Sequence, residues 1–165
     1  MRQRLALVVA ILLVPAASLL LAATKTDTLS VSATVTARAK LTLSYSAMAF
    51  ADADPDSVPS IPASGGALTI TAKARTTIGS TVTLVVKAGG DLLSGLDTIP
   101  VSQLKWTATG TGFAAGTMSK TVAQSVGAWV SSGSWTGTQS YTLLNSWSYS
   151  TGVYTSTLTY TLTAP

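Results

Sequence analysis

The sequence contains no cysteine, no histidine and no glutamate. Without cysteine the chain has no disulfide, no thiolate nucleophile and no thiolate metal ligand. Without histidine it lacks the commonest general base and transition-metal ligand, and its many serines have no His or Glu partner to activate them. We therefore expect a protein that is not an enzyme, held together by core burial and strand pairing.

Charged residues are also scarce, with 10 Lys and Arg against 6 Asp and a formal net charge of +4. The basic residues are scattered along the sequence, whereas a nucleic-acid-binding surface requires Lys and Arg gathered on one face. The sequence therefore predicts no nucleic-acid partner.

The longest apolar run lies at the N-terminus. Met1–Arg4 is basic, 5–23 is apolar apart from Ser18, and a polar stretch begins at Thr24. This layout is typical of a secretory signal peptide. We predict a signal peptide over 1–23 and a single β-sandwich domain over 24–165, secreted and either extracellular or on the cell surface. The alternative is an uncleaved membrane anchor, because about 20 apolar residues can span a bilayer.

Removal of residues 1–23 from the 165 leaves 142 residues and reduces the formal charge from +4 to +2, because Arg2 and Arg4 are lost. That length suits one domain. It is also long enough to bury a core without disulfides.

Strict alternation of apolar and polar residues is the main pattern in the remaining chain. A period of two residues indicates β-strands with one buried face. The last stretch places Tyr154, Leu158, Tyr160 and Leu162 on one face and threonines on the other. Similar stretches at 68–75 and 81–88 indicate a hairpin or a crossing between two sheets. With further short strands and Gly-rich turns, one of them expected at 136–138, the pattern predicts an all-β, Ig-like antiparallel β-sandwich of about 7–8 strands.

The alternation over 29–45 is unusually long. It would extend about 55 Å as one strand, whereas typical strands have about 5–6 residues. One interpretation is two consecutive strands, or one that bends between sheets near Ala37 and Ala39. The other is that its first half pairs with another molecule.

The stretch 48–66 is expected to be a loop, because three prolines and two glycines disfavour a regular element. It holds the one acidic cluster, Asp52, Asp54 and Asp56. Oxygen ligands at alternating positions suit calcium, which is the one cofactor the sequence suggests. However, Ser57 and Ala63 occupy the positions where a calcium loop requires Gly and an acidic residue. The alternative is a solvated loop with turn-forming aspartates.

The tryptophans suggest a second partner. Trp129 and Trp135 flank a Ser/Gly loop, and exposed aromatic rings at a sandwich edge can stack on sugar rings. This arrangement would make cell-wall polysaccharide a ligand. The alternative is that both rings anchor the loop. Trp106 and Trp147 are expected in the core or in edge packing.

The two ends of the domain carry almost no charge. There is none between Thr151 and Thr163, and Asp27 is the sole charge between Thr26 and Ala37. Uncharged strand edges tend to pair with other chains. We therefore expect a non-enzymatic structural or cell-surface protein that associates with itself or other surface proteins by strand-edge pairing. The alternatives are closure of both edges inside one sandwich and a carbohydrate- or cell-wall-binding module.

The stretches 99–106 and 152–162, the latter a Gly-Val-Tyr followed by alternating threonines, resemble a diffuse group of bacterial secreted β-sandwich proteins. This group includes WxL-type surface domains and pilin-like subunits of the spore coat U and chaperone–usher kinds. The chain lacks the paired Trp-x-Leu motifs of the former and the cysteines common in the latter. The resemblance implies an Ig-like fold and a surface or filament role without catalysis.

Overall fold

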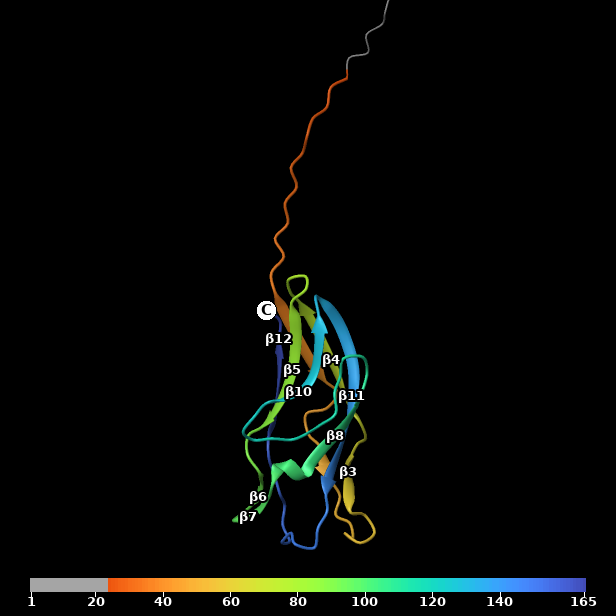
Figure 1. Ribbon diagram of the computed structural model, residues 1–165, viewed down its shortest axis with the longest axis vertical. Coiled ribbons are helices and arrows are strands. Elements are labelled where there is room, and N and C mark those ends of the chain that lie inside the picture. The colour runs from red at the N-terminus through yellow and green to blue at the C-terminus, as the bar shows by residue number, and fades with distance from the viewer. Residues whose placement is uncertain (1–23) are drawn as a thin grey trace, which may run out of the picture. The chain divides into compact units, whose positions relative to one another are not determined.

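The computed structural model describes residues 24–165, so the predicted signal peptide lies outside the described residues. All the strands fall within the compact unit 34–165 (Figure 1). The described residues 24–33 of the preceding unit contain no strand. No helix in the described part of the chain is long and apolar enough to cross a membrane.

The unit is built from two antiparallel sheets, which confirms the predicted all-β sandwich. In the larger sheet, β11 pairs with β4 and β3 along one edge and with β8 along the other. Its strands are β1 (Arg38–Leu43), β2 (Ala49–Phe50), β3 (Ser60–Ser64), β4 (Leu68–Arg75), β8 (Leu104–Thr109), β9 (Gly116–Thr117) and β11 (Gly133–Leu144). The smaller sheet has the order β10 (Gln124–Val130), β5 (Thr81–Ala88) and β12 (Leu158–Thr163).

A separate hairpin of β6 (Leu92–Ser94) and β7 (Asp97–Ile99) follows β5, and a short 3-10 turn at Val101–Gln103 leads into β8. The backbone of Leu93 also exchanges two hydrogen bonds of 3.0 Å with Thr155. The hairpin is therefore tied to the stretch that leads into β12.

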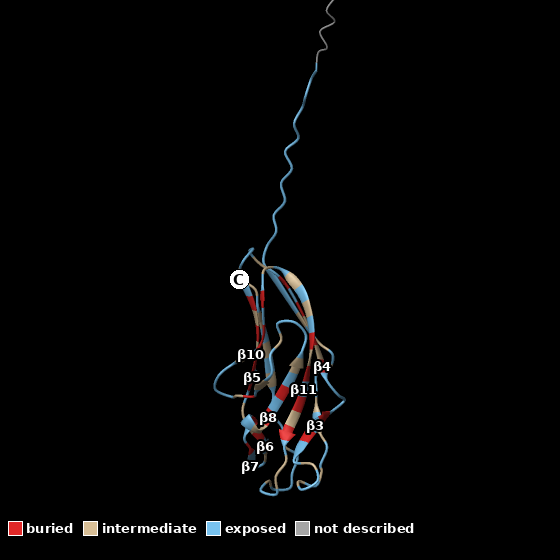
Figure 2. Ribbon diagram, turned by 45° about the vertical axis from the view of Figure 1, so that its right-hand side comes forward, coloured by how far each residue is buried: buried red, intermediate tan, exposed pale blue. Residues whose placement is uncertain are grey.

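The core lies between the sheets (Figure 2). In β4 and β5, alternate residues are buried and the residues between them face outward. Burial of apolar area stabilises the fold by about 25 cal/mol per Å². The buried members of these two strands are Leu68, Ile70, Ala72 and Ala74 of β4, and Val82, Leu84, Val86 and Ala88 of β5.

The connection from β4 to β5 is a crossing between the sheets, one of the two predicted alternatives. β4 pairs with β1 and β11, whereas β5 pairs with β10 and β12. Gly79 takes φ +81° in this turn, a conformation that L side chains rarely adopt.

Two predictions about local structure are wrong. The stretch 48–66 is not free of regular elements, since β2 and β3 lie within it. Ile61 and Ala63 of β3 are buried while Pro62 between them is exposed, so core burial stabilises a strand despite the proline. The second error concerns β11, which starts at Gly133 and includes the stretch 136–138 that we expected to form a turn.

Only part of the alternating stretch 29–45 forms a strand. β1 covers Arg38–Leu43, whereas Thr24–Ala37 has no strand. The apolar residues of this preceding part are exposed, with exposed fractions of 89% for Leu29, 85% for Val31 and 67% for Val35. The two ends of the chain form no ladder with each other in the described residues, because β1 pairs with β4 and β12 pairs with β5.

Candidate functional site: a cleft and two open strand edges

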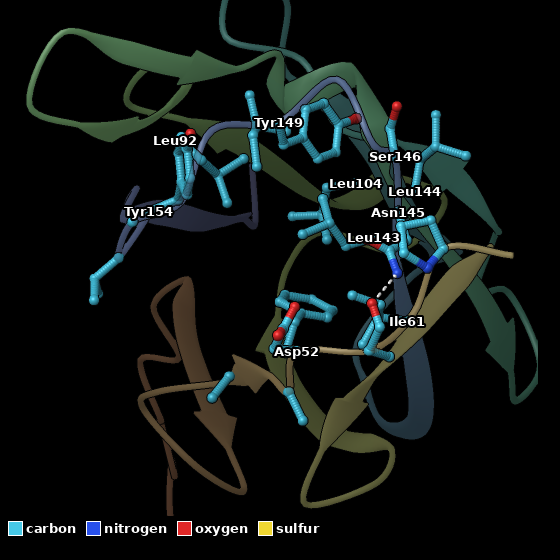
Figure 3. Close-up of a pocket in the computed structure, with 18 of the residues that line it drawn as sticks. Asp52, Ile61, Leu92, Leu104, Leu143, Leu144, Asn145, Ser146, Tyr149 and Tyr154 are labelled. Atoms are coloured by element: carbon cyan, nitrogen blue, oxygen red, sulfur yellow. Dashed lines mark hydrogen bonds between the residues drawn. The ribbon is translucent and has the colours of Figure 1, made fainter. Parts of the chain in front are cut away.

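A cleft of about 960 Å³ opens at one end of the sandwich. The larger sheet, the β6–β7 hairpin and the stretch before β12 surround it (Figure 3). One wall is the stretch Met48–Pro55, which contains β2. The other walls are the end of β11 with the following 145–147, and the stretch 149–158 that leads into β12. The cleft therefore reaches the first residue of β12.

The floor of the cleft is apolar. Five core residues line it from the larger sheet and from the β6–β7 hairpin: Ile61, Leu92, Ile99, Leu104 and Leu143. Phe50, Tyr149, Tyr154 and Leu158 are partly buried residues that pack against this core and also line the cleft. The core is thus open to solvent at this end, and its surface suits aliphatic side chains.

The rim of the cleft is acidic on the side of the loop that follows β2. Asp52 and Asp54 line it, and both are exposed. Asn145 fixes the loop by donating hydrogen bonds from Nδ2 to the carbonyls of Ala53 (2.9 Å) and Val58 (3.0 Å). The indole N–H of Trp147 donates to the Asp56 carboxylate at 3.1 Å.

Asp52, Asp54 and Asp56, the predicted calcium ligands, lie in a turn of the loop that follows β2. Asp54 accepts a hydrogen bond on Oδ1 from the Asp56 amide (2.9 Å), and its carbonyl accepts from the amides of Ser57 and Val58. This is the turn-forming role of aspartate, the alternative that the sequence left open. Within residues 24–165 no group of three carboxylates is placed to hold a metal ion.

Trp129 and Trp135, the predicted stacking pair, face each other. Their rings stack at 4.8 Å with an interplanar angle of 11°, and Phe113 meets Trp129 edge-on at 5.0 Å. Trp129 is only 6% exposed and donates its N–H to the Thr111 carbonyl at 2.8 Å. Because its faces are covered, Trp129 offers no open surface to a sugar ring.

Trp147, which we expected in the core or in edge packing, is 71% exposed at the cleft. The strand β11 ends at Leu144, and Trp147 belongs to the turn that follows it. The Asn-Ser pair at 145–146 was the sequence signal for this turn.

Among the strands of six or more described residues, β1 and β12 have an open outer edge. The outer edge of β10, by contrast, is covered by the chain around Phe113. Ala114 donates to the Val126 carbonyl at 2.8 Å, and Ala128 donates to the Gly112 carbonyl at 3.0 Å. β12 carries no charge, whereas β1 carries Arg38 and Lys40.

The two open edges lie side by side in opposite sheets (Figure 1). Each presents a row of apolar side chains that are only partly buried against the core. The rows are Leu41, Leu43 and Tyr45 at β1, and Leu158, Tyr160 and Leu162 on β12. Fully covered strands such as β5 bury their inward residues completely. This side of the sandwich is therefore incompletely covered, and the uncovered stretch continues into the cleft at Leu158.

A polar cluster lies beneath β12. Tyr141 and Tyr160 both donate their hydroxyls to Oε1 of the fully buried Gln139, with a distance of 3.1 Å for Tyr141. Burial raises the pKa of Tyr160 to about 12. Burial, together with the neighbouring Tyr160, raises the pKa of Tyr141 further above its usual value. The cluster therefore anchors β12 to the larger sheet while both hydroxyls stay neutral.

Strand pairing gathers basic side chains that are scattered in the sequence. Arg38 lies opposite Arg75 and Lys40 opposite Lys73 in the β1–β4 ladder, and all are exposed. β1, β4 and β11 contain no acidic residue. We call the four basic residues Arg38, Lys40, Lys73 and Arg75 the basic corner. None of them forms an ion pair in the described part of the chain.

The remaining carboxylates serve local structure. Asp91 pairs with Lys120 and accepts a hydrogen bond from the Val101 amide at 3.0 Å. Both contacts lower the pKa of the Asp91 carboxyl, and the hydrogen bond from Lys120 has the larger effect. Asp97 accepts a hydrogen bond from the Ser150 hydroxyl at 3.2 Å.

Comparison of the sequence with protein-family models and with curated proteins finds no match in either. The predicted resemblance to WxL-type and pilin-like proteins therefore stays a prediction.

Proposed function

We propose that the protein is a non-enzymatic, secreted structural subunit of a cell surface or filament, which associates with further copies of itself through strand edges. The observation that carries this proposal is the stretch 29–37. It has the alternating pattern of a half-buried strand, yet it belongs to no strand and its Leu29, Val31 and Val35 are exposed. Such a pattern stabilises a fold only when its apolar face is covered.

The open edges of β1 and β12 support the same proposal. An edge strand exposes unpaired backbone N–H and C=O groups that can pair with another chain, and proteins usually protect such edges with charge or proline. The six residues of β12 contain neither. Strand addition gains main-chain hydrogen bonds and buries alternate side chains.

The polysaccharide alternative keeps only one of its two predicted stacking rings, the half-buried Trp135, because Trp129 is buried against Trp135 and Phe113. An apolar floor fits aliphatic side chains better than the hydroxyl-rich face of a sugar. Assembly is therefore the function that the geometry favours.

Sedimentation velocity and electron microscopy test the proposal. The chain 24–165 is expected to form concentration-dependent oligomers or filaments. A matched chain beginning at Thr34, which keeps every strand of the compact unit, is expected to stay monomeric. If the 24–165 chain remains monomeric at all concentrations and incubation times, the proposal is wrong.

A further inference from the structure

We infer that the protein binds the surface of anionic phospholipid membranes with the end of the sandwich at which β4 turns into β5. The binding surface consists of the basic corner and the adjoining turn 76–80, and we call it the basic tip. The inference goes beyond the proposed function and does not depend on self-association, since one copy carries the whole surface. Its charge, an exposed apolar side chain and a fixed turn support it.

The basic corner concentrates positive charge at one end of a sheet. Arg38 lies opposite Arg75 and Lys40 opposite Lys73, so the four cations occupy neighbouring positions at the end of the β1–β4 ladder. All four side chains are exposed. Like charges that face each other destabilise a ladder. Contact with a negatively charged surface would remove this repulsion.

The aspartates of residues 34–165 lie away from the basic tip. Asp52, Asp54 and Asp56 belong to the loop after β2, and Asp91 and Asp97 lie at the β6–β7 hairpin. The loop and the hairpin both line the cleft. Figure 1 shows this hairpin and the turn between β4 and β5 at opposite ends of the sandwich. An anionic surface would therefore attract the basic tip and repel the other end, which orients the molecule.

An exposed isoleucine lies next to the four cations. Ile78 is 90% exposed in the turn between β4 and β5, three residues after Arg75. At most about 18 Å of extended chain separates it from Lys73. Val35 is exposed at the same end and lines a small hollow of about 160 Å³ together with Arg75 and Thr76. Apolar side chains beside cations are the groups with which peripheral proteins bind the membrane–water interface.

Hydrogen bonds to a second turn fix the turn that carries Ile78. The Ser80 amide donates to the Thr77 carbonyl at 3.1 Å, and Gly79 takes the positive φ of a type II turn. The Gly79 amide donates to Oγ of Ser131 at 2.9 Å, and the Ser131 amide donates to the Ser80 carbonyl at 2.8 Å. Because the backbone on both sides of Ile78 is held, its insertion into a membrane would cost little conformational entropy.

The isoleucine distinguishes a membrane from other anionic partners. A nucleic acid or an acidic polysaccharide would contact the four cations, but it would gain nothing from Ile78. The opposite end of the sandwich offers a comparison, because Leu96 is fully exposed in the β6–β7 turn beside Asp97. An anionic membrane repels that end, so only one of the two exposed apolar turns is suited to bind it.

Binding is expected to be reversible and sensitive to salt. Each Lys or Arg close to an anionic bilayer strengthens binding by about fivefold. Partial burial of one isoleucine adds roughly tenfold. Stable membrane association requires two such contributions, and the basic tip supplies both.

Vesicle sedimentation tests the inference. The chain 24–165, at a concentration where it is monomeric, is mixed with vesicles of phosphatidylcholine, either pure or with about one-third phosphatidylglycerol. We expect binding to the anionic vesicles alone, and weaker binding at high salt. Lys40→Gln/Lys73→Gln removes two charges from the basic corner and should weaken binding by roughly tenfold to thirtyfold.

The matched control is Lys87→Gln/Lys105→Gln, which removes two exposed charges from β5 and β8. It should weaken binding by less than about threefold, because these charges lie outside the basic tip. Urea denaturation of both double variants verifies that they are folded.

A fluorescent label tests the role of Ile78, because the chain has no cysteine of its own. Ile78→Cys and Leu96→Cys are each labelled with a polarity-sensitive fluorophore and mixed with the anionic vesicles. The emission of the label at position 78 should shift to shorter wavelength, and that at position 96 should not. Without a label, Ile78→Ser should bind roughly tenfold more weakly, whereas Leu96→Ser should bind like the wild type.

Three results would overturn the inference. They are equal binding of the two lysine double variants, no spectral shift of the label at position 78, and binding to DNA or an acidic polysaccharide without binding to vesicles. These results leave the proposed function intact, since self-association is measured without vesicles. A chain that binds vesicles through the basic tip but never self-associates would contradict the proposed function and support this inference.

Discussion

At the scale of single residues, small side chains decide where the large aromatic rings can lie. Gly137 is in the middle of β11, where glycine is otherwise unfavourable. A Cβ atom there would lie 2.5 Å from the Thr109 carbonyl oxygen and would also collide with the Phe113 ring. Phe113 in turn packs against Trp129. The sequence suggested a turn at this position, because the packing reason for a glycine in a strand is not visible in the sequence.

Gly137→Ala is therefore expected to destabilise the fold by about 1–3 kcal/mol, since a backbone oxygen cannot move away as a flexible side chain can. Gly90→Ala is the matched control, because nothing lies within 4 Å of a Cβ atom there. It should change the free energy of unfolding by less than about 0.5 kcal/mol. Urea denaturation measures both values. Equal stability of the two variants would contradict the packing explanation.

The tyrosine cluster beneath β12 predicts a loss of stability at alkaline pH. Burial raises the pKa of Tyr160 to about 12, above the value of about 10 in an unfolded chain. Below about pH 10 the hydroxyl is neutral in the folded and the unfolded chain, and its contribution to the free energy of unfolding is fully present. Between about pH 10 and 12 the unfolded chain releases the proton first, so the free energy of unfolding falls.

With Tyr160→Phe the free energy of unfolding is expected to fall less steeply between about pH 10 and 12, because one group no longer titrates. The slope should differ from the wild type by up to about 1.4 kcal/mol per pH unit. Urea denaturation between pH 9 and 12 measures the slope. Tyr154→Phe serves as a control at a tyrosine whose hydroxyl bonds to the Ser150 carbonyl outside the cluster. Identical slopes for the wild type and Tyr160→Phe would show that Tyr160 does not carry the effect.

At the scale of elements, alternation in the sequence located the strands that bury a full face. β4 and β5 fall where the pattern predicts them, at Leu68–Arg75 and Thr81–Ala88. The same signal failed before β1, where 29–37 alternates without forming a strand. Alternation indicates which face of a stretch is apolar and has to be buried. It does not indicate whether the residues that bury this face belong to the same chain. That information depends on pairing partners that are distant in sequence.

The candidate site was harder to predict than the strands. The cleft gathers residues from Met48 to Leu158, and no local pattern marks them. The basic corner likewise exists because the β1–β4 register sets Arg38 opposite Arg75. In the sequence these residues are far apart, which is why the basic residues looked scattered.

Amide hydrogen exchange is expected to rank the strands by how their edges are covered. The central strands β5 and β11 should exchange most slowly, and β1 and β12 faster, because each of the latter pairs on one edge within the described residues. In the monomer, 29–37 should exchange within seconds. On assembly, protection should appear in 29–37 and at β12 together. Protection of β1 without β12 would place the contact between copies on the β1 edge.

At the scale of the whole molecule, the charges of residues 34–165 are distributed unevenly along β11. The basic corner lies near Gly133, and Asp52, Asp54 and Asp56 lie beyond Leu144. Like charges face each other within the basic corner, since Lys40 is opposite Lys73. Such pairs destabilise a ladder slightly. An acidic surface from a second copy would relieve this repulsion.

Assembly is therefore expected to weaken as the salt concentration rises, because exposed charges are screened within about 10 Å at 0.1 M. Arg38→Glu should weaken association by roughly twofold to fivefold, as surface ion pairs contribute about 0.2–1 kcal/mol. Asp52→Lys should have a similar effect, since Asp52 is exposed on the cleft rim. The double variant Arg38→Glu/Asp52→Lys restores opposite charges across each contact, so it should recover most of the lost affinity. Sedimentation equilibrium in 50 mM and 500 mM salt measures all four proteins. Additive losses in the double variant would mean that these two residues do not meet between copies, and that charge steers assembly without fixing the contact.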